Sequence, residues 1–200
     1  MITSLPNLLT LSRILVIPVL VALFFVPGEA AKWAALILFA LAGITDYFDG
    51  YFARTRRQIS ALGRFLDPVA DKLLVASVIL LLVAFNRISG WTVLPALVIL
   101  CREILVSGLR EFLAGLRVRV PVSRLAKWKT GIQMVAIGFL IVGDAAPPPI
   151  PALEIGAAGL WIAAALTLLT GYDYLRAGLK YMTGPEAGQP PGGPEPRGEG

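Results

Sequence analysis

The chain has 200 residues, of which 56% are hydrophobic and only 16% charged, and its mean hydropathy of +0.75 is too high for an ordinary water-soluble domain. It contains no histidine, which excludes Ser–His catalytic triads, histidine zinc sites and imidazole general bases. The net charge of +5 favours anionic lipid headgroups and phosphorylated molecules as partners, and the aromatic–basic pattern of nucleic-acid-binding proteins is absent from the sequence.

In chain order, the pattern predicts an all-α, polytopic membrane protein with a short N-terminal juxtamembrane helix and six transmembrane helices. Pro6 can begin the first helix, and Asn7, Thr10 and Arg13 then follow at intervals of three on one face. A helix whose polar side meets lipid headgroups explains that spacing as well as a ligand site does. The six apolar segments each approach the roughly 20 residues that a helix needs to cross a bilayer. They cover approximately residues 8–26, 32–52, 69–85, 92–113, 125–143 and 150–175.

The lysines and arginines are distributed unevenly between the two ends of these segments. The turns after the first, third and fifth segments hold only Lys32 and Arg87, whereas most other basic residues gather at the opposite end. By the positive-inside rule, we expect an inner-membrane protein with both termini in the cytoplasm. Residues 1–183 should form one membrane domain, and the Gly- and Pro-rich residues 184–200 should form a disordered cytoplasmic tail.

Four aspartates flank the connection between the second and third apolar segments. Asp46 and Asp49 are three residues apart and Asp67 and Asp71 four apart, so each pair projects from one face of a helix. A short connection should make the two helices antiparallel neighbours and bring the pairs together. We expect Pro68 in the first turn of the second helix, which would place Asp67 at the positive end of its dipole.

Carboxylates this close to a membrane are costly, by roughly 2.5 to 3.5 kcal/mol each near its centre, so a compensating cation is expected. Oxygen ligands without nearby thiolates or imidazoles favour Mg²⁺ or Mn²⁺ over zinc or copper. Four carboxylates suit two ions, an arrangement that assists in-line displacement at phosphorus. Two alternatives stay open: interhelical Asp–Arg salt bridges without an ion, and a divalent-cation transporter with an intramembrane carboxylate site.

A second polar region interrupts the fourth and fifth apolar segments. Arg102 and Glu103 lie within an apolar helix, where they could be partners of other buried charges. Lys127 and Lys129 lie at the predicted start of the next helix, where cations oppose the helix dipole. A compensating anion is therefore expected, either a substrate phosphate or a lipid headgroup, unless these are ordinary lysines of the cytoplasmic face.

Residues 46–71 read D-x2-D-G-x2-A-R-x8-G-x3-D-x3-D, which resembles the signature of the CDP-alcohol phosphotransferases. Members of that family are integral membrane enzymes that transfer a substituted phosphate from a CDP-linked donor to an alcohol and release CMP. The resemblance implies that the four aspartates hold two divalent ions and that Asp71 also accepts the proton of the acceptor hydroxyl. It further implies a homodimer, and a donor site for CDP-diacylglycerol formed by Asn7, Thr10, Gly50, Arg54, Ser60 and Gly63.

The second polar region resembles the branch of the family that uses glycerol 3-phosphate as acceptor. The motifs are R-E-I-L-V-S-G-L-R-E from residue 102 and S-x-L-x-K-x-K-T from residue 123, although residues 120–122, V-P-V, depart from the small residues usual there. The resemblance implies that the acceptor phosphate is bound by Arg110, Ser123, Lys127 and Lys129, with Arg102 assisting. Inositol phosphate, serine or phosphatidylglycerol as acceptor stays open, but a neutral acceptor would not need this basic set.

Overall fold

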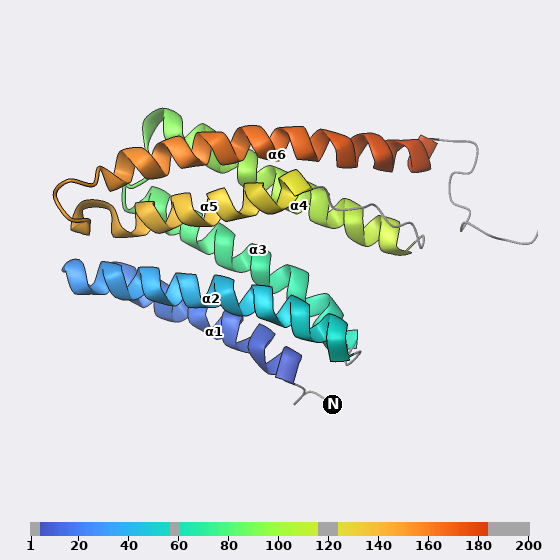
Figure 1. The fold of residues 1–200 in the computed structure, drawn as a ribbon, viewed down its shortest axis with the longest axis horizontal. Coiled ribbons are helices and arrows are strands. Elements are labelled where there is room, and N and C mark those ends of the chain that lie inside the picture. The colour runs from blue at the N-terminus through green and yellow to red at the C-terminus, as the bar shows by residue number, and fades with distance from the viewer. Residues whose placement is uncertain (1–4, 57–60, 116–123, 184–200) are drawn as a thin grey trace, which may run out of the picture.

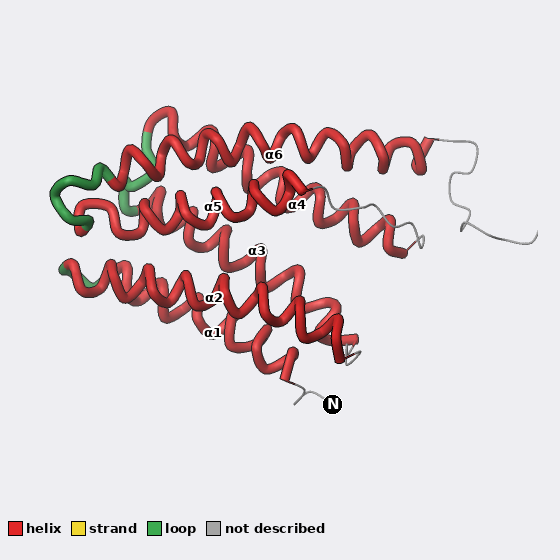
Figure 2. Tube along the Cα trace, viewed as in Figure 1, coloured by secondary structure: helices red, strands yellow, loops and turns green. Residues whose placement is uncertain are grey.

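A computed structural model describes residues 5–56, 61–115 and 124–183, and within them it contains helices and turns but no strand (Figure 2). The all-α prediction is therefore confirmed for this part of the chain. The elements are α1 (Leu5–Phe25), α2 (Glu29–Arg56), α3 (Ala61–Ala84), η1 (Gly90–Thr92), α4 (Val93–Gly115), α5 (Arg124–Val142), η2 (Gly143–Ala145) and α6 (Ala152–Thr183).

The helices form an antiparallel bundle. The α1–α2, α3–α4 and α5–α6 turns lie at one end, and the starts of α1, α3 and α5 and the ends of α2, α4 and α6 lie at the other (Figure 1). Helix α1 packs against α2 and α3, while α6 packs against α4 and α5, and α2 meets α5. The bundle therefore joins an N-terminal trio of helices to a C-terminal trio.

The first helix is longer than expected. The predicted juxtamembrane segment and the first span form one continuous helix, α1, which includes Pro18. The polar face with Asn7 and Thr10 thus occupies the first turns of α1 rather than a separate helix.

The α2–α3 connection is shorter than expected. Helix α2 continues to Arg56 and α3 begins at Ala61, so Gly50, Arg54 and Gly63 lie within helices. The prediction that Pro68 opens α3 and that Asp67 sits at its positive end was wrong. Residues 61–66, A-L-G-R-F-L, are mostly good helix formers and begin the helix before the proline is reached.

Apolar side chains fill the bundle interior, and glycines allow the closest helix contact. The buried residues that line the shared core include Leu20, Phe39, Leu74, Ile99, Leu140 and Leu160. Helix α6 approaches α5 through two glycines: a Cβ at Gly156 would lie 2.6 Å from Leu140 Cγ, and one at Gly159 would lie 2.7 Å from Ala136 Cβ. Small residues at such contacts are typical of helix packing in membranes.

Within the described residues, two helices are long and apolar enough to cross a membrane, Gly90–Gly115 and Ala152–Arg176. Two shorter apolar helices are Leu11–Phe25 and Lys72–Ala84. Large apolar side chains are exposed on every one of the six helices, as on a lipid-facing surface, for example Leu15, Ile37, Leu80, Leu97, Val135 and Leu169. Two of the six predicted spans are thus long and apolar enough to be transmembrane helices.

A small ion cluster joins the turns at the end away from the N-terminus. Lys32 Nζ lies 2.7 Å from Asp144 Oδ2, and Arg87 NH2 lies 2.9 Å from Asp144 Oδ1. Arg87 also donates a hydrogen bond to the Val142 carbonyl at 3.2 Å. Gly143 has a φ of +53°, and a Cβ at this position would collide with the Arg87 guanidinium. We call Lys32, Arg87 and Asp144 the turn ion cluster.

Candidate active site

The four signature aspartates lie on the two helices that border residues 57–60. Asp46 and Asp49 are in the second half of α2, and Asp67 and Asp71 are in the first half of α3. Because the helices run in opposite directions, both pairs are at the same end of the bundle, where α1 begins (Figure 1). The aspartate side chains lie outside the described part of the structure, so their convergence on metal ions stays a prediction.

Most residues of the predicted donor site belong to the same helices as the aspartates or to the start of α1. The helical backbone is described, but not the side chains, at Asn7, Thr10, Gly50, Arg54 and Gly63, while Ser60 and the acceptor-site Ser123 fall outside the described residues. Arg13 continues the polar face of α1 by one turn, and its side chain is 1% exposed. An arginine is rarely this buried without a structural or functional reason.

A group of charged side chains, which we call the charge cluster, joins α3, α4 and α5. Glu103 of α4 is at its centre: Oε2 lies 2.9 Å from Lys72 Nζ of α3, and Oε1 contacts Lys129 Nζ of α5. Arg102 NH1 is 3.4 Å from the same Oε1. Lys129 is only 3% exposed. Even without Lys72, Arg102 and Lys129 leave a formal charge of +1 around the Glu103 carboxylate, so a further anion would stabilise the cluster.

Helix α6 closes one side of the charge cluster around Arg102. Arg102 NH2 donates a hydrogen bond of 3.0 Å to Thr170 Oγ1, and its guanidinium carbon is 5.9 Å from the centre of the Tyr174 ring. Gly171 permits this approach, since a Cβ there would lie 3.1 Å from Arg102 Cγ. The buried Nε of Arg102 has no hydrogen-bond partner among the described residues, and neither has Oε1 of Gln133, one turn after Lys129.

The structure brings together two of the residues predicted to bind the acceptor phosphate. Arg102 and Lys129 meet at the charge cluster, whereas Arg110 and Lys127 are exposed. The interpretation of Glu103 as a partner of other buried charges is confirmed by its contacts with Lys72 and Lys129. Arg102 contacts Glu103 itself and Thr170. Sequence reasoning missed Lys72, although a lysine directly after Asp71 in an apolar run was a signal that could have found it.

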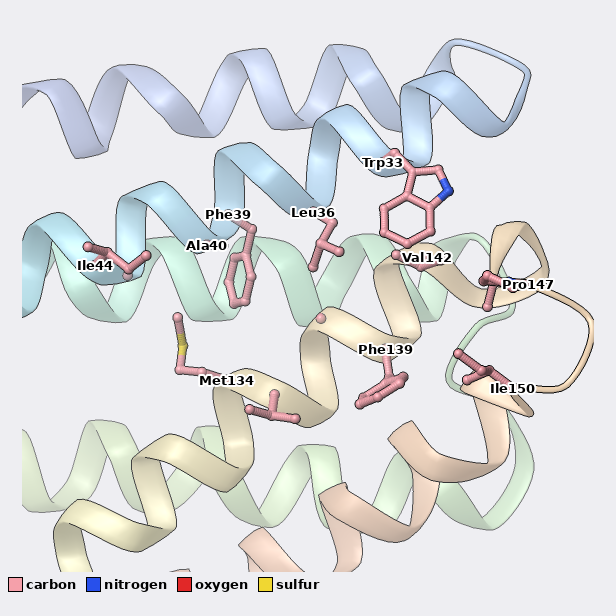
Figure 3. Close-up of a pocket in the computed structure, with 14 residues that line it drawn as sticks. Trp33, Leu36, Phe39, Ala40, Ile44, Met134, Phe139, Val142, Pro147 and Ile150 are labelled. Atoms are coloured by element: carbon pink, nitrogen blue, oxygen red, sulfur yellow. The ribbon is translucent and has the colours of Figure 1, made fainter.

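An apolar groove of about 640 Å³ lies between parts of α2 and α5. In Figure 3, Leu36 and Phe39 of α2 point toward α5, and Met134 of α5 points toward α2. Trp33 and Ile150 lie near its end at the turns. The side chains around this groove suit an aliphatic chain and not a charged ligand.

Comparison with known proteins identifies the family. The sequence profile described as CDP-alcohol phosphatidyltransferase matches residues 3–169. The chain belongs to the CDP-alcohol phosphatidyltransferase family. A Rickettsia felis relative named CDP-diacylglycerol–glycerol-3-phosphate 3-phosphatidyltransferase is 48% identical over 179 residues, which cover 90% of this chain and 97% of the relative. A Shigella flexneri relative of the same name is 43% identical over 176 residues, 87% of this chain and 94% of the relative.

The donor atoms of the family signature fit a hard divalent cation. The four aspartates supply only carboxylate oxygens, which suit Mg²⁺ or Mn²⁺, and the chain has no histidine that would favour zinc. Among the described side chains, no three His, Cys, Asp or Glu residues are grouped closely enough to hold an ion, and the four aspartates are not among those side chains. The aspartate set thus remains the candidate metal site on the chemistry of its ligands.

Proposed function

We propose that this chain transfers the phosphatidyl group of CDP-diacylglycerol to glycerol 3-phosphate, which gives phosphatidylglycerol phosphate and CMP. The charge cluster carries the proposal, because a partly buried surplus of positive charge suits an acceptor that bears a phosphate. Relatives at 43% to 48% identity carry the name of this reaction. The apolar groove supports a donor whose acyl chains stay in the lipid phase.

In the proposed reaction, the acceptor hydroxyl oxygen forms a bond to the phosphorus that bears the diacylglycerol, and the bond from that phosphorus to the CMP oxygen breaks. Asp71 takes the proton from the attacking hydroxyl, through a carboxylate oxygen that is free to accept it. When bound, two Mg²⁺ or Mn²⁺ ions on the four aspartates would neutralise the diphosphate of the donor. The CDP part of the donor would contact Asn7, Thr10, Gly50, Arg54, Ser60 and Gly63.

The acceptor would bind through its phosphate at the charge cluster. Arg102 and Lys129 hold the phosphate, with Arg110 and Lys127 as further cations and the Ser123 hydroxyl as a hydrogen-bond donor. A neutral acceptor such as serine would leave these cations without an anion. Serine is therefore disfavoured as the acceptor. Inositol phosphate and phosphatidylglycerol also carry a phosphate, and glycerol 3-phosphate is favoured over them by the name that the relatives carry.

The proposal includes six membrane spans, a cytoplasmic active site and a homodimer in the inner membrane. Its topology is testable in a Cys101→Ser background, with single cysteines at Ser89 and Gly115 and a membrane-impermeant maleimide. In right-side-out vesicles, the cysteine at position 89 should be labelled and the one at 115 protected. Labelling of both positions, or only of 115, would contradict this topology. Light scattering of the purified protein tests the dimer.

The function is tested by offering purified protein CDP-diacylglycerol with one acceptor at a time and following CMP release. Glycerol 3-phosphate should support the fastest release and yield phosphatidylglycerol phosphate. Faster release with inositol phosphate, serine or phosphatidylglycerol would assign the chain to another acceptor. Divalent-ion flux through proteoliposomes without CMP release would instead favour the transporter.

A further inference from the structure

Glu103 is an acidic residue in a site proposed to bind an anion. Taken alone, its charge repels a phosphate, and a neutral residue would bind the acceptor more tightly. Yet its carboxylate contacts Lys72, Arg102 and Lys129, from three consecutive helices. The geometry therefore suggests that the carboxylate organises these cations, at some electrostatic cost to phosphate binding.

The two lysines reach Glu103 from helices that pack mainly on other partners. Helix α3 packs mostly against α1, and α5 mostly against α6. Glu103 Oε2 binds Lys72 of α3, and Oε1 contacts Lys129 of α5, so one carboxylate joins the two ammonium groups. Without it, three cations would repel one another in surroundings of low dielectric constant. The flexible lysine side chains would then separate.

The contacts leave donors for a second anion. A lysine ammonium has three N–H donors and a guanidinium has five. Lys129 contacts Glu103 through Nζ, and the Nε of Arg102 has no hydrogen-bond partner among the described residues. A phosphate can therefore bind Lys129 and Arg102 while both keep their contacts with Glu103.

We propose that Glu103 is a positioning residue for the acceptor phosphate: it holds Lys72 and Lys129 together, so that a phosphate meets them already assembled. This inference rests on the proposed function and adds two residues to it, Glu103 and Lys72. Glu103 does not touch the reacting atoms. Its effect reaches the acceptor through the two lysines.

Glu103→Gln distinguishes this positioning role from simple repulsion of the phosphate, because the two predict opposite changes in the KM for glycerol 3-phosphate. If Glu103 positions the lysines, the KM for glycerol 3-phosphate should rise about ten-fold or more, with the KM for CDP-diacylglycerol changed much less. If Glu103 only repels phosphate, the KM for glycerol 3-phosphate should fall. An unchanged or lower KM would overturn the proposal. Glu111→Gln, at an exposed glutamate on the same helix, is the matched control and should leave both KM values near those of the wild type.

A double-mutant cycle tests whether Glu103 acts through Lys129. Lys129→Gln alone should raise the KM for glycerol 3-phosphate, and adding Glu103→Gln should then raise it far less than in the wild-type background. Additive effects of the two substitutions would contradict the proposed route. Thermal unfolding in detergent establishes that each variant is folded before its KM is interpreted.

Glu103→Asp keeps the charge on a shorter side chain, and its KM for glycerol 3-phosphate should lie between those of the wild type and Glu103→Gln. If Glu103→Gln does not fold, Glu103→Asp tests the proposal in its place. A KM for glycerol 3-phosphate equal to that of the wild type would then overturn the proposal. Failure of the proposed function looks different. In that case the wild-type protein itself releases no CMP with glycerol 3-phosphate.

Discussion

The ammonium group of Lys72 lies 2.9 Å from the carboxylate of Glu103, and this ion pair joins α3 to α4. Lys72 directly follows Asp71, the residue to which we assign proton transfer. The ion pair therefore anchors α3 to α4 at the position next to Asp71. The proposed acceptor site and the proposed metal site thus share one helix. Four consequences of this arrangement and of the bundle around it can be measured.

Replacing Asp71 with asparagine should abolish turnover while CDP-diacylglycerol still binds, because the amide keeps the size of the carboxylate but cannot take the proton. A general base contributes about 10² to 10⁴ in rate, so CMP release should fall by at least that lower factor. Donor binding is measured by calorimetry on the same sample. Asp144→Asn is the control, a carboxylate at the opposite end of the bundle. Full activity of Asp71→Asn would exclude the base assignment.

Lys129→Met and Lys127→Met form a matched pair in the first two turns of α5. Lys129 is buried at the charge cluster, whereas Lys127 is exposed. Loss of a charged hydrogen bond costs about 1.5 to 3 kcal/mol, so Lys129→Met should lower kcat/KM for glycerol 3-phosphate by about ten-fold or more. Lys127→Met should lower it less. The measurement is steady-state kinetics with varied glycerol 3-phosphate. A larger loss of kcat/KM in Lys127→Met than in Lys129→Met would mean that the phosphate does not bind at the charge cluster.

The turn ion cluster should stabilise the protein at neutral pH and lose its effect in acid. The hydrogen bond from Lys32 holds the pKa of the Asp144 carboxyl below its ordinary value. A lowered pKa means that the contribution is present above the unfolded-state value, near pH 4, and is lost as the pH falls through the lower, folded-state value. Because the Asp144 side chain is 67% exposed, we expect less than about 1 kcal/mol.

The measurement is the difference in thermal unfolding midpoint between the wild type and Asp144→Asn in detergent. The wild type should be slightly more stable at pH 7, and the difference should shrink below about pH 4. A difference that grows in acid would contradict the sign of the pKa shift.

Gly159→Ala should destabilise the α5–α6 contact, because the added Cβ would lie 2.7 Å from Ala136 Cβ. Overpacking of this kind costs about 1 to 3 kcal/mol. Gly108→Ala is the control: it lies within α4, and among the described residues no atom outside the adjoining stretch of that helix lies within 4 Å of the added Cβ. That substitution should be neutral or gain up to about 1 kcal/mol from helix propensity. The measurement is the thermal unfolding midpoint of each variant. Equal midpoints for Gly159→Ala and Gly108→Ala would mean that α6 can move away from α5 without a loss of stability.

The sequence predicted the helical class and the family well, because apolar runs of membrane length and the fixed spacing of the aspartate signature are local patterns. It predicted the start of α3 incorrectly, since Pro68 was read as a helix opening while the six residues before it were already helix formers. The charge cluster was predicted only in part. Lys72, Glu103 and Lys129 are far apart in the sequence, and only the packing of α3, α4 and α5 brings them together.

Phosphatidyl transfer to glycerol 3-phosphate can be followed through the fate of a labelled acceptor. Purified protein in mixed micelles is given CDP-diacylglycerol, Mg²⁺ or Mn²⁺, and glycerol 3-phosphate labelled with radioactive phosphorus. The label should enter the lipid phase in equal amount to the CMP released, and a chelator should stop both. Label that stays in the aqueous phase while CMP appears, or the absence of CMP, would contradict it.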